Sequence, residues 1–202
     1  MIILDIETSG IDKMRCGVWQ IGAIDLNNPK EFFLQEGRID EEDEIVNSGK
    51  KPVLEVIGKT EEELRNKKKQ SQKELLINFF KWIEQRPILN FLCQNPQFDV
   101  AFLEIKAMRY GLKIPFHYRS FDLHSFAQKK YFDLNGNFLI KERHSDMGLK
   151  NILNFCGMQD NREAHNALED CKLTGECFSR IVFGRNLFEE FSKFEIPDYL
   201  KK

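Results

Sequence analysis

The sequence predicts an α/β fold in which a mixed central sheet is flanked by helices. Three strand-like stretches with short turns come first, and they predict an antiparallel meander. Later, short apolar stretches alternate with segments of helical periodicity, which predicts parallel strands joined by helices. A length of 202 residues and a hydrophobic fraction of 42% fit one domain with a single core.

The meander is expected in the N-terminal segment. Residues 1–6 form a short apolar stretch rich in isoleucine, which is typical of a buried strand. Two more strands are expected at 18–26 and 31–35, because the turn-forming residues 27–29 separate them.

The middle of the chain changes character twice. Residues 40–70 are charged and interrupted by glycine and proline, which favours exposed loops and short helices. In residues 72–85 apolar side chains recur at helical spacing, and Pro87 stops this helix. The apolar residues 88–93 then predict the next strand.

A second helix is expected at 98–111, where apolar residues form one stripe and a glycine closes the helix. Residues 117–121 predict a strand, and residues 122–131 predict a helix. The dipeptide Asn135-Gly136 is typical of a hairpin turn, although residues 133–147 are polar enough to form a mobile loop.

Two helices, at 148–156 and 163–183, complete the expected domain, which covers residues 1–185. The remaining tail, residues 186–202, is amphipathic. Such a tail either docks on the body of the domain or stays loose.

The charge balance limits how this protein holds nucleic acid. Thirty Lys and Arg residues nearly balance 32 Asp and Glu residues. This balance excludes tight charge-driven coating of duplex, which needs a large basic excess. Because acids bind phosphate only through cations, the composition still allows a nuclease that uses metal ions.

Cysteine usage and hydropathy predict a cytoplasmic protein. Five cysteines, an odd number without a CxxC pair, favour free thiols in a reducing compartment. No apolar run reaches the ~18 residues of a membrane span, so neither a signal peptide nor an anchor is expected. An alternative use of the thiols is a zinc site without a closely spaced chelating pair, built from Cys156, His165, Cys171 and Cys177.

Two acids, Asp5 and Glu7, lie two positions apart in the first expected strand. Side chains alternate along a strand, so both carboxylates project from the same face. Like charges this close raise each other's pKa and cost stability unless a cation neutralises them. Two readings follow: a divalent metal bound by both acids, or a strand that frays after Leu4 and leaves them solvated.

Three further residues carry the candidate site. Asp99 lies in the first turn of an expected helix, where an acid either caps the helix or joins the ligands gathered at a sheet edge. His165 and Asp170 are five residues apart, which is ~140° of rotation on a helix. They can act together only if His165 lies on the segment before the helix.

Together these motifs resemble those of the DEDD superfamily of 3′→5′ exonucleases, which have the DnaQ-like, RNase H-like fold. Residues 5–8 (DIET) resemble the first motif, and residues 95–99 (NPQFD) resemble the second. Residues 165–170 (HNALED) resemble the third motif in its histidine-containing variant, DEDDh. Residues 19–23 (WQIGA) resemble the family's second strand, which often carries Glu where this chain has Gln20.

The resemblance implies an exonuclease domain over residues 1–185 that hydrolyses phosphodiesters with two ions of Mg²⁺ or Mn²⁺. His165 is implied as the general base that accepts the proton of the attacking water. The product would be a nucleoside 5′-monophosphate. The implied metal ligands are four acids, with Asp5 bridging the ions and Asp99 acting through bound water: Asp5, Glu7, Asp99 and Asp170.

The expected substrate is a single-stranded or frayed 3′ end of DNA or RNA. Backbone groups near Thr8, Ser9 and Gly10 and stacking on Phe98 are the expected contacts with a few terminal nucleotides. One alternative is a catalytically idle module that grips nucleic-acid ends. Another is an accessory subunit whose tail docks a polymerase or another protein.

Overall fold

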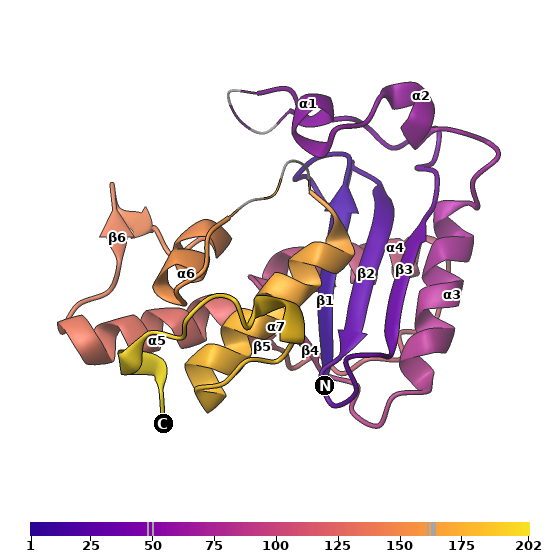
Figure 1. Ribbon diagram of the computed structural model, residues 1–202. Helices are drawn as coiled ribbons and strands as arrows, with labels where there is room; N and C mark the ends of the chain where they lie inside the picture. Colours follow the sequence, from indigo (N-terminus) through magenta and orange to yellow (C-terminus); the bar gives the residue numbers. More distant parts are fainter. Residues whose placement is uncertain (48, 50, 161, 163–164) are drawn as a thin grey trace.

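The computed structural model describes residues 1–47, 49, 51–160, 162 and 165–202. A five-stranded sheet of order β3-β2-β1-β4-β5 forms its centre (Figure 1). The first three strands pair antiparallel, and β4 and β5 extend the sheet in parallel with β1. The predicted meander and the mixed sheet are therefore confirmed. The strands are β1 (Ile2–Thr8), β2 (Val18–Asp25), β3 (Phe32–Glu36), β4 (Phe91–Cys93) and β5 (Phe121–Asp122).

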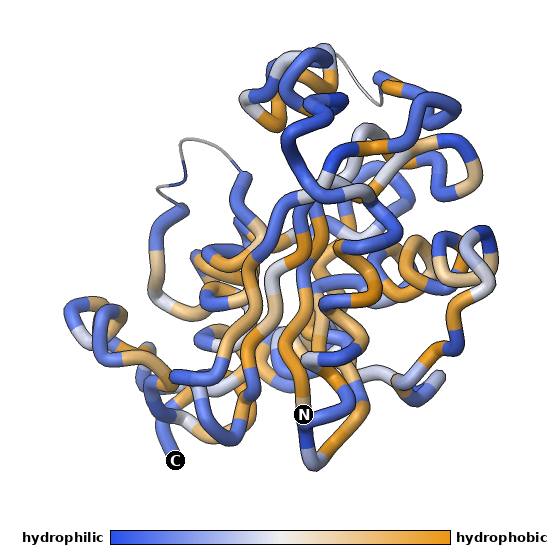
Figure 2. Tube along the Cα trace, turned by 90° about the vertical axis from the view of Figure 1, so that its right-hand side faces the viewer, coloured by the Kyte–Doolittle hydropathy of each residue, from blue (hydrophilic) through white to orange (hydrophobic). Residues whose placement is uncertain are grey.

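Helices cover both faces of this sheet, as expected. On one face, α3 (Gln72–Glu84) and α4 (Pro96–Arg109) pack on the even-numbered residues of β1. On the other face, α5 (Leu123–Asn135), α6 (Leu149–Phe155) and α7 (Ala167–Phe183) form a second core that includes Ile3. Figure 2 shows the hydrophobic stretches of the chain running through the middle of these layers. Alternation along β1 thus directs its odd-numbered side chains toward α7.

The short helices expected between residues 40 and 70 are present. α1 (Val53–Ile57) and α2 (Glu61–Leu64) lie beyond the carboxyl end of β1 (Figure 1). Their apolar residues form a small third core with Trp19 and Ile39. One wall of the space above β1 is therefore built by this segment.

The two parallel strands are shorter than expected. The strand predicted at 88–93 begins at Phe91, and the strand predicted at 117–121 consists of Phe121–Asp122. Ile88 and Tyr118 are 42% and 71% exposed, so these apolar residues lie outside the buried part of the sheet.

Residues 133–147 differ most from expectation. α5 continues to Asn135, and Gly136 ends it with a left-handed φ of 73°, so Asn135-Gly136 ends a helix and does not form the predicted hairpin turn. A hairpin forms later, from β6 (Ile140–Lys141) and β7 (His144–Ser145). The Gln128 side chain donates to and accepts from the backbone of Leu139, each at 3.0 Å, and so fixes this segment to α5. The segment therefore contains a helix end and a short hairpin, and the hairpin lies after the position that the sequence predicted.

The start of α7 differs from the expected start, Glu163, which lies outside the described residues. The Asn166 side chain accepts the backbone N–H groups of Leu168 and Glu169 at 3.1 and 3.3 Å and caps the helix. The helix therefore begins at Ala167 and leaves His165 on the preceding segment.

The C-terminal tail is docked against α7. Glu176 and Arg180 are fully buried in α7 and form an ion pair at 2.7 Å. Glu176 accepts the backbone N–H groups of residues 187 and 188, and Arg180 donates to the carbonyl oxygens of Phe191 and Phe194. The rings of these two phenylalanines also pack against the second core. These aromatic residues of the tail are therefore engaged within the chain itself.

The cysteines do not form the alternative zinc site. All five are buried free thiols. Cys156, Cys171 and Cys177 belong to the second core, whereas His165 is exposed. None of the helices in the described part of the chain combines the length and the hydropathy that a membrane span requires.

Candidate active site

The two acids of β1 lie at the base of a cleft of about 510 Å³. β1 stays paired with β2 as far as Thr8, so the reading in which the strand frays after Leu4 is wrong. Glu7 is only 7% exposed, and Asp5 is partly exposed. The strand therefore holds both carboxylates in place.

Asp99 reaches the same cleft from α4. Asn95, with a left-handed φ of 69°, and Pro96 begin the helix, and Asp99 follows one turn later. Its carboxylate accepts the backbone N–H of Ile6 at 3.1 Å. Asp99 thus lies in the first turn of α4, where an acid is favoured, and its bond with Ile6 also joins α4 to β1 beside the two strand acids.

The first turn of α7 lies directly on β2. A Cβ atom at Gly22 would lie 2.4 Å from the backbone of Ala167, so a larger residue at position 22 would push the helix away. Gln20 holds the same turn, because its Oε1 accepts the Ala167 N–H at 2.8 Å. This close approach buries Asp170, which is 4% exposed, beside the acids of β1.

His165 lies on the segment before α7, the position that its spacing from Asp170 requires. Its Nδ1 lies 3.2 Å from Asp170 Oδ2, and its side chain is 46% exposed. Glu7, His165 and Asp170 each offer one ligand atom, and these atoms lie within 4.8 Å of one another. With Asp5 and Asp99 lining the same cleft, the fold brings all five predicted residues together.

The acids of this cleft are crowded and poorly hydrated. Burial is the main cause that raises the pKa of Glu7 to about 7 and the pKa of Asp99 to about 8. The pKa of Asp5 is raised well above its usual range, first by burial and then by the charges of neighbouring acids. Oxygen donors that repel one another in this way fit a hard divalent cation.

Three of the four predicted substrate contacts line the cleft: Thr8, Gly10 and Phe98. Ser9 does not. Its hydroxyl donates to the Glu44 carbonyl at 2.6 Å and accepts the Gly17 N–H at 2.9 Å, and its own N–H donates to the Gly17 carbonyl. Ser9 therefore fixes the turn after β1 and has no free donor for a substrate, which corrects the prediction.

Arg162 is a residue of the cleft that motif reasoning missed. Its Nη1 lies 2.8 Å from Asp170 Oδ1, and its Nε and Nη2 donate to Asp160 at 2.8 and 2.7 Å. The available signal was a lone arginine three residues before His165 in the sequence. Gln20 differs from the family pattern in the sequence, but no sequence pattern indicates its contact with the first turn of α7.

Residues 2–178 match the sequence model of the RNase_T family, described as exonuclease. The chain belongs to this exonuclease family. The match covers the three acidic motifs and ends within α7, inside the expected exonuclease domain of residues 1–185. No curated protein matched the chain in a sequence search.

Solved structures with the same fold include DEDDh exonucleases. The nuclease domain of 3′hExo, a DEDDh family member bound to rAMP, has a TM-score of 0.66 and 15% identity over 98% of this chain and 95% of that chain. Cell-death related nuclease 4 has a TM-score of 0.65 and 16% identity over 92% of this chain and 64% of that chain. A zinc-bound complex of E. coli ExoI with ssDNA has a TM-score of 0.65 and 16% identity over 95% and 42%. This chain thus spans less than half of ExoI. Together these matches confirm the predicted RNase H-like exonuclease fold.

Proposed function

We propose that this exonuclease shortens nucleic-acid strands from the 3′ end and releases nucleoside 5′-monophosphates. The observation that carries the proposal is the gathering of Asp5, Glu7, Asp99, His165 and Asp170 around one cleft. Proteins of the same fold hold related ligands, since one compared structure contains rAMP and another contains ssDNA. The expected substrate is DNA or RNA.

The acids of the cleft would hold two divalent ions, Mg²⁺ or Mn²⁺. Asp5, Glu7 and Asp170 would hold these ions, and Asp99 would support the site from the same cleft. Such ions supply a hydroxide nucleophile at neutral pH and stabilise the charge on the leaving oxygen. The raised pKa values of Glu7 and Asp99 support this assignment, because a bound cation would stabilise the charged carboxylates that burial, and to a smaller extent neighbouring acids, disfavour.

His165 is the proposed general base. The hydrogen bond with Asp170 is the main cause that raises its pKa, and a raised pKa favours the protonated ring. A base must be neutral to accept a proton. Cations held by Asp170 would oppose the effect of that carboxylate and return the ring to its neutral form. The His165 side chain lines the cleft and is 46% exposed, so water has access to it.

Strand ends fit this cleft better than a continuous duplex. The volume of about 510 Å³ lies within the range of roughly 300–1,000 Å³ for small-molecule sites. Charge neutralisation over many phosphates needs many basic residues, and the net charge of this chain is −2. Recognition would therefore rest on a few nucleotides, with a terminal base stacked on Phe98.

The test uses strands labelled at the 5′ end, with DNA and RNA compared directly. Each strand is incubated with Mg²⁺ or with excess chelator, beside a blunt duplex, a 3′-phosphorylated strand and a circular single strand. We expect a ladder that shortens from the 3′ end only with metal, slower cutting of the duplex, and resistance of the 3′-phosphorylated strand.

Two results would contradict the proposal: internal fragments from the circle, or full activity in excess chelator. A strand that is bound with metal but never shortened would instead support the idle end-binding module.

A further inference from the structure

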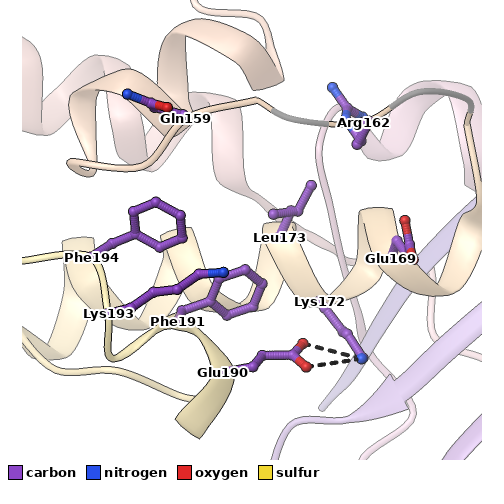
Figure 3. A pocket seen from close by; sticks show the side chains of 9 residues that line it. All are labelled: Gln159, Arg162, Glu169, Lys172, Leu173, Glu190, Phe191, Lys193 and Phe194. Atoms are coloured by element: carbon purple, nitrogen blue, oxygen red, sulfur yellow. Dashed lines mark hydrogen bonds and ion pairs between the residues drawn. The ribbon is translucent and has the colours of Figure 1, made fainter.

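Arg162 stands where the catalytic cleft meets two neighbouring hollows. One hollow, of about 310 Å³, lies between Arg162, Leu173 of α7 and Phe194 of the tail (Figure 3). The other, of about 480 Å³, is lined by Arg162, Lys59 and Trp19. A strand that leaves the cleft by either hollow would pass the guanidinium.

The guanidinium is held unequally by its two acidic partners. Asp160 accepts two hydrogen bonds, from Nε and Nη2, whereas Asp170 accepts one, from Nη1. The Arg162 side chain is only 15% exposed. If the bond to Asp170 were broken, Asp160 would therefore still keep Arg162 at the cleft, with the Nη1 group free to find another acceptor.

Each carboxylate oxygen of Asp170 already has a positively charged or polar partner. Its Oδ1 lies 2.8 Å from Arg162, and its Oδ2 lies 3.2 Å from His165. A divalent cation that takes Asp170 as a ligand must therefore compete with the arginine, and a positive charge beside the site also repels the cation. Arg162 is in this sense a resident counter-ion of the acidic cluster.

We infer that Arg162 exchanges partners, pairing with Asp170 in the metal-free protein and with a phosphate of the substrate strand once divalent cations hold Asp170. The inference rests on the proposed function, because it needs both the metal and the strand.

A phosphate suits the released guanidinium for two reasons. Guanidinium N–H groups form strong, directional hydrogen bonds with phosphate oxygens. In addition, the described residues that line the cleft include few positive groups: Lys150, Arg162 and His165. Of these, Arg162 and His165 both contact the proposed metal ligand Asp170. Because His165 is assigned to the attacking water, Arg162 is the group that metal binding would make available to the strand.

The exchange predicts effects of opposite sign for Arg162→Gln. Without the guanidinium that competes for Asp170, divalent metal should bind more tightly when no nucleic acid is present, by on the order of tenfold. Without the phosphate contact, a strand should bind more weakly in the presence of metal, also by on the order of tenfold. General damage to the cleft would instead weaken both.

The experiment measures Mg²⁺ binding by calorimetry and strand binding by fluorescence anisotropy. The strand carries phosphorothioate linkages at its 3′ end to slow hydrolysis. Arg185→Gln is the matched control, because it removes the same charge from an exposed position just beyond the other end of the 17-residue α7. Circular dichroism checks that each variant is folded.

Tighter metal binding together with weaker strand binding in Arg162→Gln, and neither change in Arg185→Gln, would support the exchange. Unchanged or weaker metal binding would overturn it, and so would tighter metal binding with unchanged strand binding. A wild-type protein that binds no divalent metal would overturn the proposed function and this inference with it, so the two failures are distinguishable.

Discussion

Glu7→Gln should stabilise the metal-free protein at alkaline pH. The pKa of Glu7 is raised from 4.5 to about 7, mainly by burial. A raised carboxyl pKa means that the folded state binds the proton more tightly than the unfolded state does. Ionisation of Glu7 therefore costs stability, with a cost that begins near pH 4.5, grows as the pH rises and is complete above pH 7.

The size of this cost follows from the shift. At 1.36 kcal/mol per pKa unit, a rise from 4.5 to about 7 corresponds to roughly 3 kcal/mol at pH 8, and to under about 1 kcal/mol at pH 5. For a chain of 202 residues, about 3 kcal/mol is worth on the order of 6–12 °C in Tm. The pKa of about 7 already includes the attraction of His165 and Arg162 for the carboxylate, which lowers it.

The assay is urea unfolding in excess chelator at pH 5 and pH 8. Glu84→Gln on the exposed end of α3 is the matched control. Wild-type protein should itself lose stability between these pH values, because the raised pKa values of Asp99 and His165 act in the same direction. The reasoning would be refuted if Glu7→Gln were no more stable than wild type at pH 8, or equally stabilised at both pH values.

Three other substitutions test the site and the fold. His165→Ala should lower single-turnover rates by ~10²–10⁴-fold while metal binding stays nearly unchanged, and a normal rate would remove it from the mechanism. Asp5→Asn should abolish turnover with an unchanged circular dichroism spectrum, whereas loss of folding would show a structural role. Glu176→Gln leaves Arg180 buried without its anion, so the free energy of unfolding should fall by about 3–5 kcal/mol. The exposed control Glu189→Gln should stay within about 0.5 kcal/mol in the same denaturant series.

The sequence predicted the elements and acids whose signals are local. The alternation in β1 is enough to place Asp5 and Glu7 on one face, and the spacing of His165 from Asp170 is enough to place the histidine before α7. Helical periodicity located α3 and α4 to within a few residues. Each of these inferences uses only residues that are neighbours in the chain.

The errors occur where contacts between distant segments decide the structure. Asn135-Gly136 has the composition of a hairpin turn, but Gln128 on the preceding helix and the apolar face of α5 select a helix end instead. Ser9 follows the first motif and was expected to contact the substrate, but its groups bond with Glu44 and Gly17. Nothing in the local sequence of either segment reports these partners.

Contacts between distant segments also explain why this chain has Gln20 where the family often has Glu. Gln20 lies directly opposite Glu7 in the pairing of β1 with β2, accepts the Ala167 N–H and donates to Glu36 Oε1 at 3.2 Å. A carboxylate at this position could accept the first bond but could not donate the second. It would also add a like charge opposite Glu7, whose pKa is already raised to about 7. Because Glu36 faces the side chain at position 20, the amide holds the first turn of α7 in place without adding to the repulsion among the acids of the cleft.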